Sequence, residues 1–209
     1  MIRAISFASV YVYSPQGSSA VSGRSRLLLA LLKSDDGKFI SKYAGRVRQQ
    51  AIELPLFADF FAGSDLLIPI PGSAPQGRRT RWVAEHLALA MVREGIGRRV
   101  MPLLRRVSAV RKSATAPAGA RPTVTRHYDS FAVERCEPAP DRIVLVDDVI
   151  TKGRTLLAAA ARVHEAFPSA RISAFALVRT MGLVPGVNCL LDPCRGEIRW
   201  NRGDAQRNP

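Results

Sequence analysis

The stretch "RIVLVDDVITKGRT", residues 142 to 155, decides the fold. An apolar run, Ile143 to Val146, leads into two adjacent aspartates, Asp147 and Asp148, and a loop bracketed by two threonines follows. From Gly153 to about Phe167 the apolar residues then recur at helical spacing. A buried strand, a tight loop and a helix in this order are typical of α/β proteins.

The loop after this strand is suited to a phosphate group. Ligands of open α/β sheets bind at the carboxyl ends of the strands, and a helix N-terminus there presents unsatisfied N–H donors. Thr151 and Thr155 add hydroxyl donors, and Gly153 lets the chain come close to a ligand. The sequence therefore predicts a cradle for a terminal phosphomonoester.

The two aspartates need a different partner, because like charges would repel a phosphate. Carboxylates accept hydrogen bonds from vicinal hydroxyls, and together with a phosphorylated sugar they can hold Mg²⁺. A phosphate on one side and a diol with a metal on the other describe a ribose 5-phosphate. Asp147 and Asp148 are therefore predicted to bind the sugar.

Other segments predict more elements of the same α/β fold. "DLLIPIP", residues 65 to 71, is a short strand that ends at proline, and Trp82 to Val92 has the apolar spacing of a helix. Ile40 to Phe61 also has helical spacing, with Pro55 expected to break or bend it. Further strands are expected at residues 2–13 and 172–178.

Composition bounds the class of protein. With 209 residues, 47% hydrophobic and 23% charged, the chain is expected to be one globular domain. The longest aliphatic run, Leu27 to Leu32, is far shorter than the roughly 20 residues of a membrane span. With no signal-peptide pattern in the first residues, we expect a cytoplasmic protein. Three cysteines and three scattered histidines do not form a zinc-ligand pattern.

The net charge of +14, from 31 basic and 17 acidic residues, has two interpretations. Such a charge attracts polyanions, either nucleic acid or phosphorylated substrates. An arginine-rich composition alone explains it equally well. Aromatic residues make up only 7%, so a stacking platform for single strands is not indicated.

Residues 107 to 127, "VSAVRKSATAPAGARPTVTRH", hold small, polar and basic residues with two prolines. A loop this long inside a compact domain is usually a lid, a binding loop or a linker. We expect it to be mobile until a ligand arrives.

The segment "IVLVDDVITKGRT" resembles the PRPP (phosphoribosyl pyrophosphate) binding motif of type I phosphoribosyltransferases: four hydrophobic residues, two acidic residues, two mostly apolar ones and a Thr-x-Gly-x-Thr loop. The resemblance implies that Asp147 and Asp148 contact the ribose 2′ and 3′ hydroxyls. It also implies that the loop binds the 5-phosphate of PRPP. That loop consists of Thr151, Lys152, Gly153, Arg154 and Thr155.

More of the chain is similar to the same family. Pro71, Gly72 and Ser73 are placed like its pyrophosphate loop, and residues 107 to 127 like its flexible catalytic loop. The ComF-like branch, the competence-related amidophosphoribosyltransferase-like proteins, is most similar over residues 25 to 180. The sequence departs from that branch by lacking its cysteine-rich zinc module, and by "RHYDSF", Arg126 to Phe131, where an Arg-x-x-Asn element is usual.

The resemblance implies a central, mostly parallel sheet flanked by helices, with a small N-terminal hood-like segment. We expect residues 1–62 to form that segment, residues 63–200 the phosphoribosyltransferase-like core, and residues 201–209 a frayed tail.

The implied activity, retained or once present, is transfer of ribose 5-phosphate from PRPP to a nitrogen nucleophile. The expected small-molecule partner is PRPP, or else a nucleoside or ribose 5-phosphate. Mg²⁺ would arrive on PRPP, close to Asp147 and Asp148, with no metal held by the protein alone. Arg111 or Lys112 would stabilise the leaving pyrophosphate.

Other functions remain open. A non-catalytic protein that senses PRPP or nucleotides, or that serves DNA uptake through a basic surface, is the main alternative. No carboxylate in residues 107 to 127 could deprotonate an amine, which favours this alternative slightly. A nucleoside triphosphatase is disfavoured because no G-x-x-x-x-G-K-[ST] loop precedes the aspartates. A receiver-type acidic pocket would lie nearer the start of the chain. A homodimer is also left open.

Overall fold

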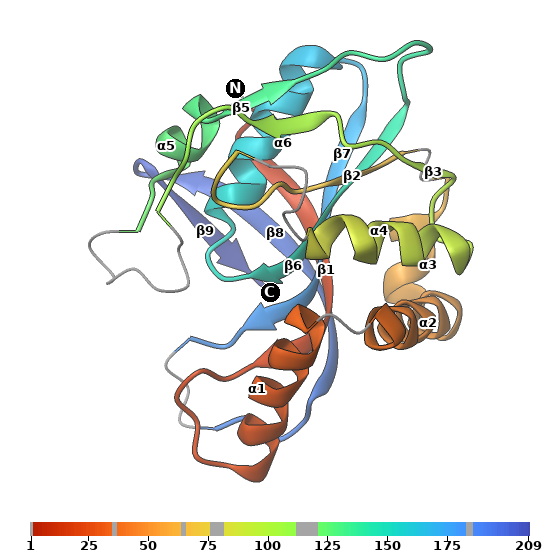
Figure 1. The fold of residues 1–209 in the computed structure, drawn as a ribbon, viewed down its shortest axis with the longest axis vertical. Helices are drawn as coiled ribbons and strands as arrows, with labels where there is room; N and C mark the ends of the chain where they lie inside the picture. Colours follow the sequence, from red (N-terminus) through yellow and green to blue (C-terminus); the bar gives the residue numbers. More distant parts are fainter. Residues whose placement is uncertain (1, 35–36, 64–65, 76–81, 112–120, 183–185) are drawn as a thin grey trace.

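The computed structural model describes the chain apart from residue 1 and residues 35–36, 64–65, 76–81, 112–120 and 183–185. The strands of its main sheet are β1 (Ala4–Tyr13), β2 (Leu66–Pro69), β3 (Arg99–Val100), β6 (Arg142–Ile150), β7 (Arg171–Thr180), β8 (Leu191–Asn201) and β9 (Asp204–Asn208). They pair in the order β3-β2-β6-β7-β1-β8-β9 (Figure 1). All neighbours from β3 to β1 are parallel, whereas β8 is antiparallel to both β1 and β9. A mostly parallel α/β sheet is thus confirmed.

Helices cover both faces of the sheet (Figure 1). They are α1 (Ala20–Lys33), α2 (Gly37–Glu53), α3 (Pro55–Phe61), α4 (Val83–Arg93), α5 (Val124–Asp129) and α6 (Arg154–Ala166). Pro55 separates α2 from α3, as the sequence predicts: Leu54 before it is extended, with φ −108° and ψ 118°, and proline takes the first helical position. A smaller antiparallel pair, β4 (Leu104–Arg106) with β5 (Phe131–Val133), lies beside α5 and α6.

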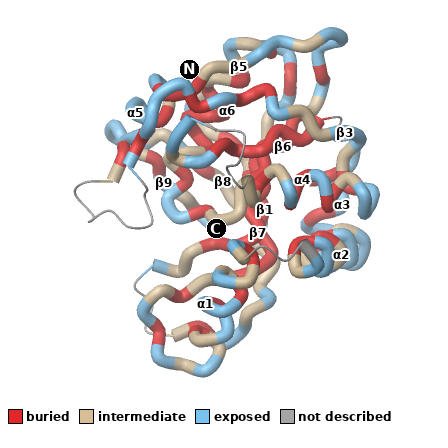
Figure 2. The backbone as a smooth tube through the Cα atoms, in the orientation of Figure 1, coloured by how far each residue is buried: buried red, intermediate tan, exposed pale blue. Residues whose placement is uncertain are grey.

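Strand β6 lies in the interior of the molecule, where most of it is buried (Figure 2), and its side chains belong to two separate cores. Ile143 and Leu145 pack in one core with α6, while Val144 and Val146 pack in the other with α1 to α4. Successive side chains of a strand point to opposite faces, which explains why this apolar run is continuous and not alternating. Burying each such side chain contributes roughly 1.5–3 kcal/mol, so the run anchors the strand that carries the aspartates.

Two expectations about the ends of the chain are wrong. The N-terminal residues 1–62 do not stand apart as a hood, because β1 is an inner strand of the main sheet between β7 and β8. Residues 201–209 do not fray, because most of them form β9. The hairpin from β8 to β9 turns at Arg202 and Gly203, whose φ angles are 47° and 85°. Two positive φ angles in a two-residue turn match the twist of antiparallel strands.

Among the described residues, every helix falls short of the length and hydrophobicity needed to cross a membrane.

Candidate functional site

Asp147 and Asp148 lie inside β6, near its carboxyl end, and not in the loop that follows. Both are half-buried. The backbone N–H of Asp148 donates to Oδ1 of Asp147 at 2.9 Å, and the N–H of Val149 donates to Oδ1 of Asp148 at 3.0 Å. These two bonds hold the carboxylates in place, and the pair keeps further acceptor capacity for a ligand.

The neighbouring carboxylate of Asp148 disfavours the charge of Asp147. Burial and the neighbouring Asp148 raise the pKa of Asp147 well above its usual range, and Lys33 at the end of α1 opposes this only partly. Ionised Asp147 is therefore poorly compensated within the described part of the protein. Hydroxyl donors or a cation would supply the missing compensation, which is what a diol with a bound Mg²⁺ offers.

The loop after β6 leads into an open helix N-terminus. Gly153 has φ 84°, and its carbonyl accepts the first bond of α6 from the N–H of Leu157 at 2.9 Å. The N–H groups of Arg154, Thr155 and Leu156 lie before this first bond and so have no partner within the helix. Among the described residues, no side-chain hydrogen bond caps the helix at Gly153. Three donors at a positive helix end are therefore available to an anion.

The reason for glycine at this position differs from the one expected. A Cβ on Gly153 would lie 2.7 Å from Cγ2 of Ile198 on β8, so the missing side chain makes room for the sheet and not for a ligand. The left-handed φ is a second requirement for glycine. The phosphate loop is thus packed against the C-terminal hairpin.

The two cations of the loop point to that hairpin as well. Arg154 forms a two-pronged ion pair with Asp204 of β9, at 2.5 and 2.6 Å, and also donates to the carbonyls of Arg121 and Pro122 at 3.5 and 3.3 Å. The Nζ of Lys152 lies 3.5 Å from Asp204 Oδ2. The hydrogen bonds from Arg154 lower the pKa of Asp204 to about 2. The Arg154 side chain therefore docks β9, leaving its backbone N–H for a phosphate.

The two threonines of the loop have different partners. Thr151 Oγ1 lies 3.3 Å from Thr180 Oγ1 at the end of the neighbouring β7. Thr155 Oγ1 lies 3.4 Å from Nε2 of His127 on α5. Both hydroxyls lie at the carboxyl edge of the sheet, as the sequence predicts, but His127 was not expected to support either of them.

The predicted pyrophosphate loop lies at the same edge. Pro71, Gly72 and Ser73 follow β2, which pairs with β6 up to Val146. The side chain of Trp82 donates to the carbonyl of Ile70 at 2.6 Å, which fixes the start of this loop. The structure thus brings the predicted loop and the two aspartates to neighbouring strand ends.

The predicted catalytic loop is described only at its two ends. The N–H of Val110 donates to the Ser73 carbonyl at 2.7 Å, so the following residue, exposed Arg111, leaves the site next to the pyrophosphate loop. Lys112 lies outside the described residues. The C-terminal end is not a loop: α5 begins at Val124, capped by the Thr123 hydroxyl, which accepts from the N–H of Arg126 at 3.2 Å.

A buried arginine, Arg106 of β4, joins the separate parts of the site. Its Nε donates to the Gly72 carbonyl at 2.8 Å, its Nη1 donates to the Ser130 hydroxyl, and the same Nη1 lies 3.4 Å from Nδ1 of His127. Its guanidinium also stacks 4.0 Å above the ring of Phe131. Burial lowers the pKa of Arg106 to about 10, and the nearby Asp147 charge opposes this. Arg106 stays charged at neutral pH.

Arg106 also determines the tautomer of His127. Burial, Arg106 and Arg154 lower the pKa of His127 to about 4, so the ring is neutral at pH 7. Since a guanidinium only donates, Nδ1 of the ring must accept, and the ring proton is on Nε2. Nε2 then donates to Thr155 Oγ1, which leaves the Thr155 hydroxyl proton free to donate to a ligand.

Among the described residues, no three His, Cys, Asp or Glu side chains come together as a metal-ligand group. Mg²⁺ commonly takes one or two carboxylates and completes its shell with water and substrate phosphates. Asp147 and Asp148 fit that pattern, with a phosphorylated ligand supplying the remaining oxygens.

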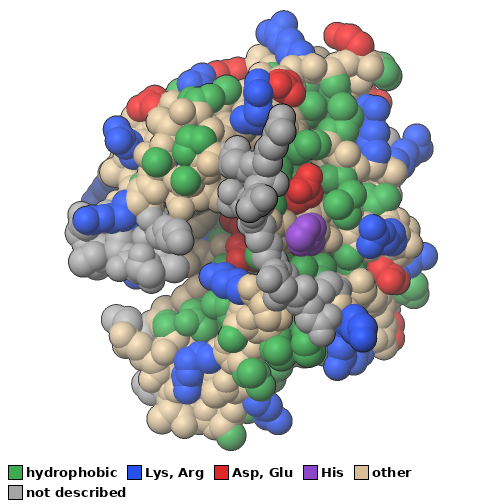
Figure 3. Space-filling view, in the orientation of Figure 1, with side chains coloured by type: hydrophobic (Ala, Val, Ile, Leu, Met, Phe, Trp, Pro, Cys, Tyr) green, Lys and Arg blue, Asp and Glu red, His purple; other side chains and the backbone are tan. Residues whose placement is uncertain are grey.

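The basic residues do not gather into one band on the face seen in Figure 3, where blue side chains are separated by hydrophobic and other residues.

No protein-family model and no curated protein matches this sequence.

Proposed function

We propose that this protein binds PRPP with Mg²⁺ and transfers ribose 5-phosphate to a nitrogen nucleophile, as a type I phosphoribosyltransferase of the ComF-like kind. The observation that carries the proposal is the carboxylate pair, Asp147 and Asp148, near the carboxyl end of β6, a strand of a mostly parallel sheet that leads through a short loop into the N-terminus of α6, which no side chain caps. This arrangement matches a diol and a phosphate separated by one sugar ring.

Each part of PRPP has a matching group. The 5-phosphate would accept from the N–H groups that open α6 and from the hydroxyls of Thr151 and Thr155. The ribose hydroxyls would donate to Asp147 and Asp148. The pyrophosphate would lie along Pro71 to Ser73, whose position is held by Arg106 through the Gly72 carbonyl.

The chemical step needs positioning and charge stabilisation. Cleavage of the bond between the anomeric carbon and pyrophosphate builds positive charge on the ribose and negative charge on the leaving group. Mg²⁺ would neutralise the pyrophosphate, and Arg111, which follows the Val110 whose N–H donates to the Ser73 carbonyl, would assist. The ionised aspartates hold the ribose while the nucleophile approaches. Exclusion of water from the closed site would protect the activated sugar from hydrolysis.

A second candidate function is a binding protein that keeps the PRPP pocket without transfer. The observation in its favour is that residues 107 to 127 contain neither Asp nor Glu, so the predicted catalytic loop offers no carboxylate base. Its positive charge would then serve a nucleic-acid partner. A nucleophile that arrives unprotonated would need no base, and this keeps transfer as the first proposal.

The test is calorimetric titration with PRPP, with and without Mg²⁺. We expect metal-dependent binding by the unmodified protein that Asp147→Asn/Asp148→Asn abolishes. Asp141→Asn, an exposed carboxylate at the start of the same strand, is the matched control and should bind normally. Equal binding by the double variant would refute the pocket. Binding without pyrophosphate release in the presence of ammonia, amines and nucleobases would favour the second candidate.

A further inference from the structure

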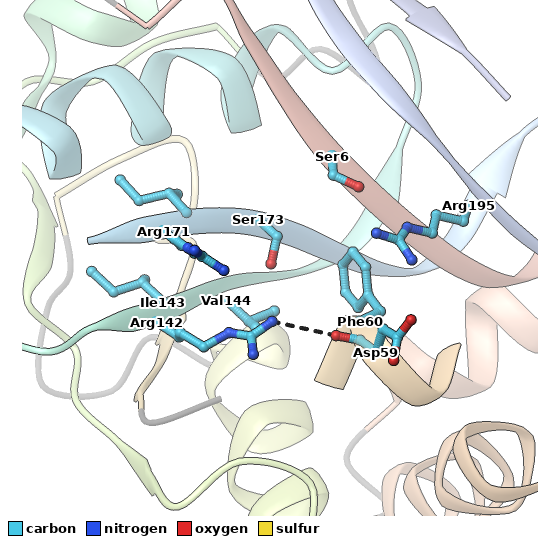
Figure 4. A pocket seen from close by; sticks show the side chains of 10 residues that line it. Ser6, Asp59, Phe60, Arg142, Ile143, Val144, Arg171, Ser173 and Arg195 are labelled. Atoms are coloured by element: carbon cyan, nitrogen blue, oxygen red, sulfur yellow. Dashed lines mark hydrogen bonds between the residues drawn. The ribbon is translucent and has the colours of Figure 1, made fainter. Parts of the chain in front are cut away.

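A cavity lies at the opposite edge of the main sheet from the aspartates. It has a volume of about 180 Å³ and is lined from the amino ends of β6 and β7, from β1 and β8, and from α3 (Figure 4). Arg142, Arg171 and Arg195 contribute three guanidinium groups, and Ser6 and Ser173 contribute two hydroxyls. The proposed PRPP site uses none of these residues.

The three arginines come together through the sheet. Arg142 and Arg171 are direct register partners at the starts of the parallel strands β6 and β7. Arg195 approaches from β8, with its guanidinium 5.7 Å from the ring centre of Phe60. In Figure 4 the Arg142 and Arg171 side chains extend towards the Phe60 ring from one side and Arg195 lies on the other. The sheet register thus brings two like charges side by side, and the third comes from β8.

Among the described residues, no salt bridge involves any of these three arginines, of which Arg142 is half-buried and Arg171 and Arg195 are exposed at the mouth of the cavity. Arg142 donates to the backbone carbonyl of Asp59 at 3.3 Å, not to its carboxylate (Figure 4). Of the described residues that line the cavity, only Asp59 carries a carboxylate, and no salt bridge joins it to any of the three. By contrast, Arg154 and Arg179 elsewhere in the molecule each pair with an aspartate.

We propose that this cavity is a second anion site, which binds a small tetrahedral oxyanion such as inorganic phosphate or the phosphate group of a small metabolite. Guanidinium groups recognise such oxyanions by paired hydrogen bonds, and the two serine hydroxyls add donors. A cavity of about 180 Å³ bounded by five elements and the Phe60 ring suits a compact anion, since a polymer backbone requires a continuous groove.

The test is a titration of the full-length ¹⁵N-labelled protein with inorganic phosphate at constant ionic strength, followed by amide chemical shifts. The amides of Ser6, Ile172 and Ser173 report on the cavity. The amides of Thr155 and Leu156 report separately on phosphate bound at α6, so the two sites are distinguished in one experiment. We expect saturable shifts of the cavity amides. Their absence would overturn the proposal, whatever happens at α6.

Variants assign the site to the arginines. Arg171→Met keeps the aliphatic stem and should weaken phosphate binding at the cavity amides by about tenfold or more, as expected for a lost charge-assisted hydrogen bond. Arg24→Met, which removes one charge from the exposed face of α1, should leave binding unchanged. Equal weakening by both variants would mean general charge attraction and would refute the site. Shifts of the cavity amides with single-stranded DNA but not with phosphate would refute the small anion as ligand.

Discussion

His127 Nε2 lies 3.4 Å from Thr155 Oγ1, and the opposite ring nitrogen lies 3.4 Å from the guanidinium of Arg106. Because arginine is only a donor, the chain of bonds has one direction, from Arg106 through neutral His127 to Thr155. The Gly72 carbonyl binds the same Arg106. The loop proposed for pyrophosphate and the loop proposed for the 5-phosphate are therefore held by one buried pair.

This direction predicts that the Thr155 hydroxyl donates to the ligand's phosphate. Thr155→Val keeps the shape and removes the donor, so PRPP affinity should fall by roughly tenfold to a hundredfold, the range for a hydrogen bond to a charged group. Thr155→Ser keeps the hydroxyl and should bind within a few-fold of the unmodified protein. Calorimetric titration of both variants checks this, and equal affinities for valine and serine would exclude the role.

His127 should make stability depend on pH. Its pKa is lowered from 6.5 to about 4 in the folded protein, so between these values the unfolded chain takes up a proton that the folded one does not. The contribution of neutral His127 to the free energy of unfolding is fully present above pH 6.5. It falls by up to about 3 kcal/mol as the pH falls towards 4. Urea unfolding from pH 7.5 to 4.5 should show a steeper loss for the unmodified protein than for His127→Gln.

The control for this pH dependence is His86→Gln, which removes an exposed histidine of α4 and should follow the unmodified protein. Asp147 titrates in the opposite sense but is present in all three proteins, so the difference between the curves isolates His127. Parallel curves for the His127→Gln variant and the unmodified protein would contradict the neutral, buried ring.

The charge of Asp147 should lower the stability of the protein but raise its affinity for PRPP. Its pKa is raised in the folded protein, so folding favours the protonated form, and stability falls as the pH rises through the raised value. Asp147→Asn removes the charge and keeps an oxygen for the N–H of Asp148. We expect this variant to be about 1 kcal/mol more stable at pH 8, with the advantage shrinking towards pH 4, and to lose PRPP affinity.

Thermal unfolding of Asp147→Asn beside Asp141→Asn checks the stability half of this prediction, because Asp141 is an exposed carboxylate just before the same strand. If Asp147→Asn is less stable than the unmodified protein at pH 8, then the ionised carboxylate is compensated by groups other than those described, and the poor compensation inferred for Asp147 is wrong.

The central elements were predictable because local pattern and burial agree there. The apolar run before Asp147 forms the buried strand β6, and the helical spacing after Gly153 forms α6. The carboxyl ends of parallel strands lie at one edge of a sheet. The position of Pro71 to Ser73 near the aspartates could therefore be predicted once β2 and β6 were expected to be parallel strands of the same sheet.

The supporting residues were not predictable, since their roles depend on contacts between distant segments. Arg106 is 34 residues from Gly72, and His127 is 28 residues from Thr155. Neither has a local pattern that distinguishes it from a solvated basic residue. The polar sequence of β9 likewise carries no strand signal, because its structure depends on pairing with β8 and on the ion pair between Arg154 and Asp204.

Gly153 provides the last prediction, which tests whether the C-terminal hairpin positions the phosphate loop. Gly153→Ala should lose about 1–2 kcal/mol for a side chain at φ 84°, and more from the contact of its Cβ with Ile198. In Gly153→Ala/Ile198→Ala the contact is removed but the backbone cost remains. If the hairpin sets the loop, the double variant should recover part of the PRPP affinity that Gly153→Ala loses, although Ile198→Ala alone destabilises the protein by creating a cavity. Unfolding and titration of all three variants form a double-mutant cycle. Strictly additive losses would show that Ile198 does not restrain the loop, and that glycine is needed there for its backbone conformation alone.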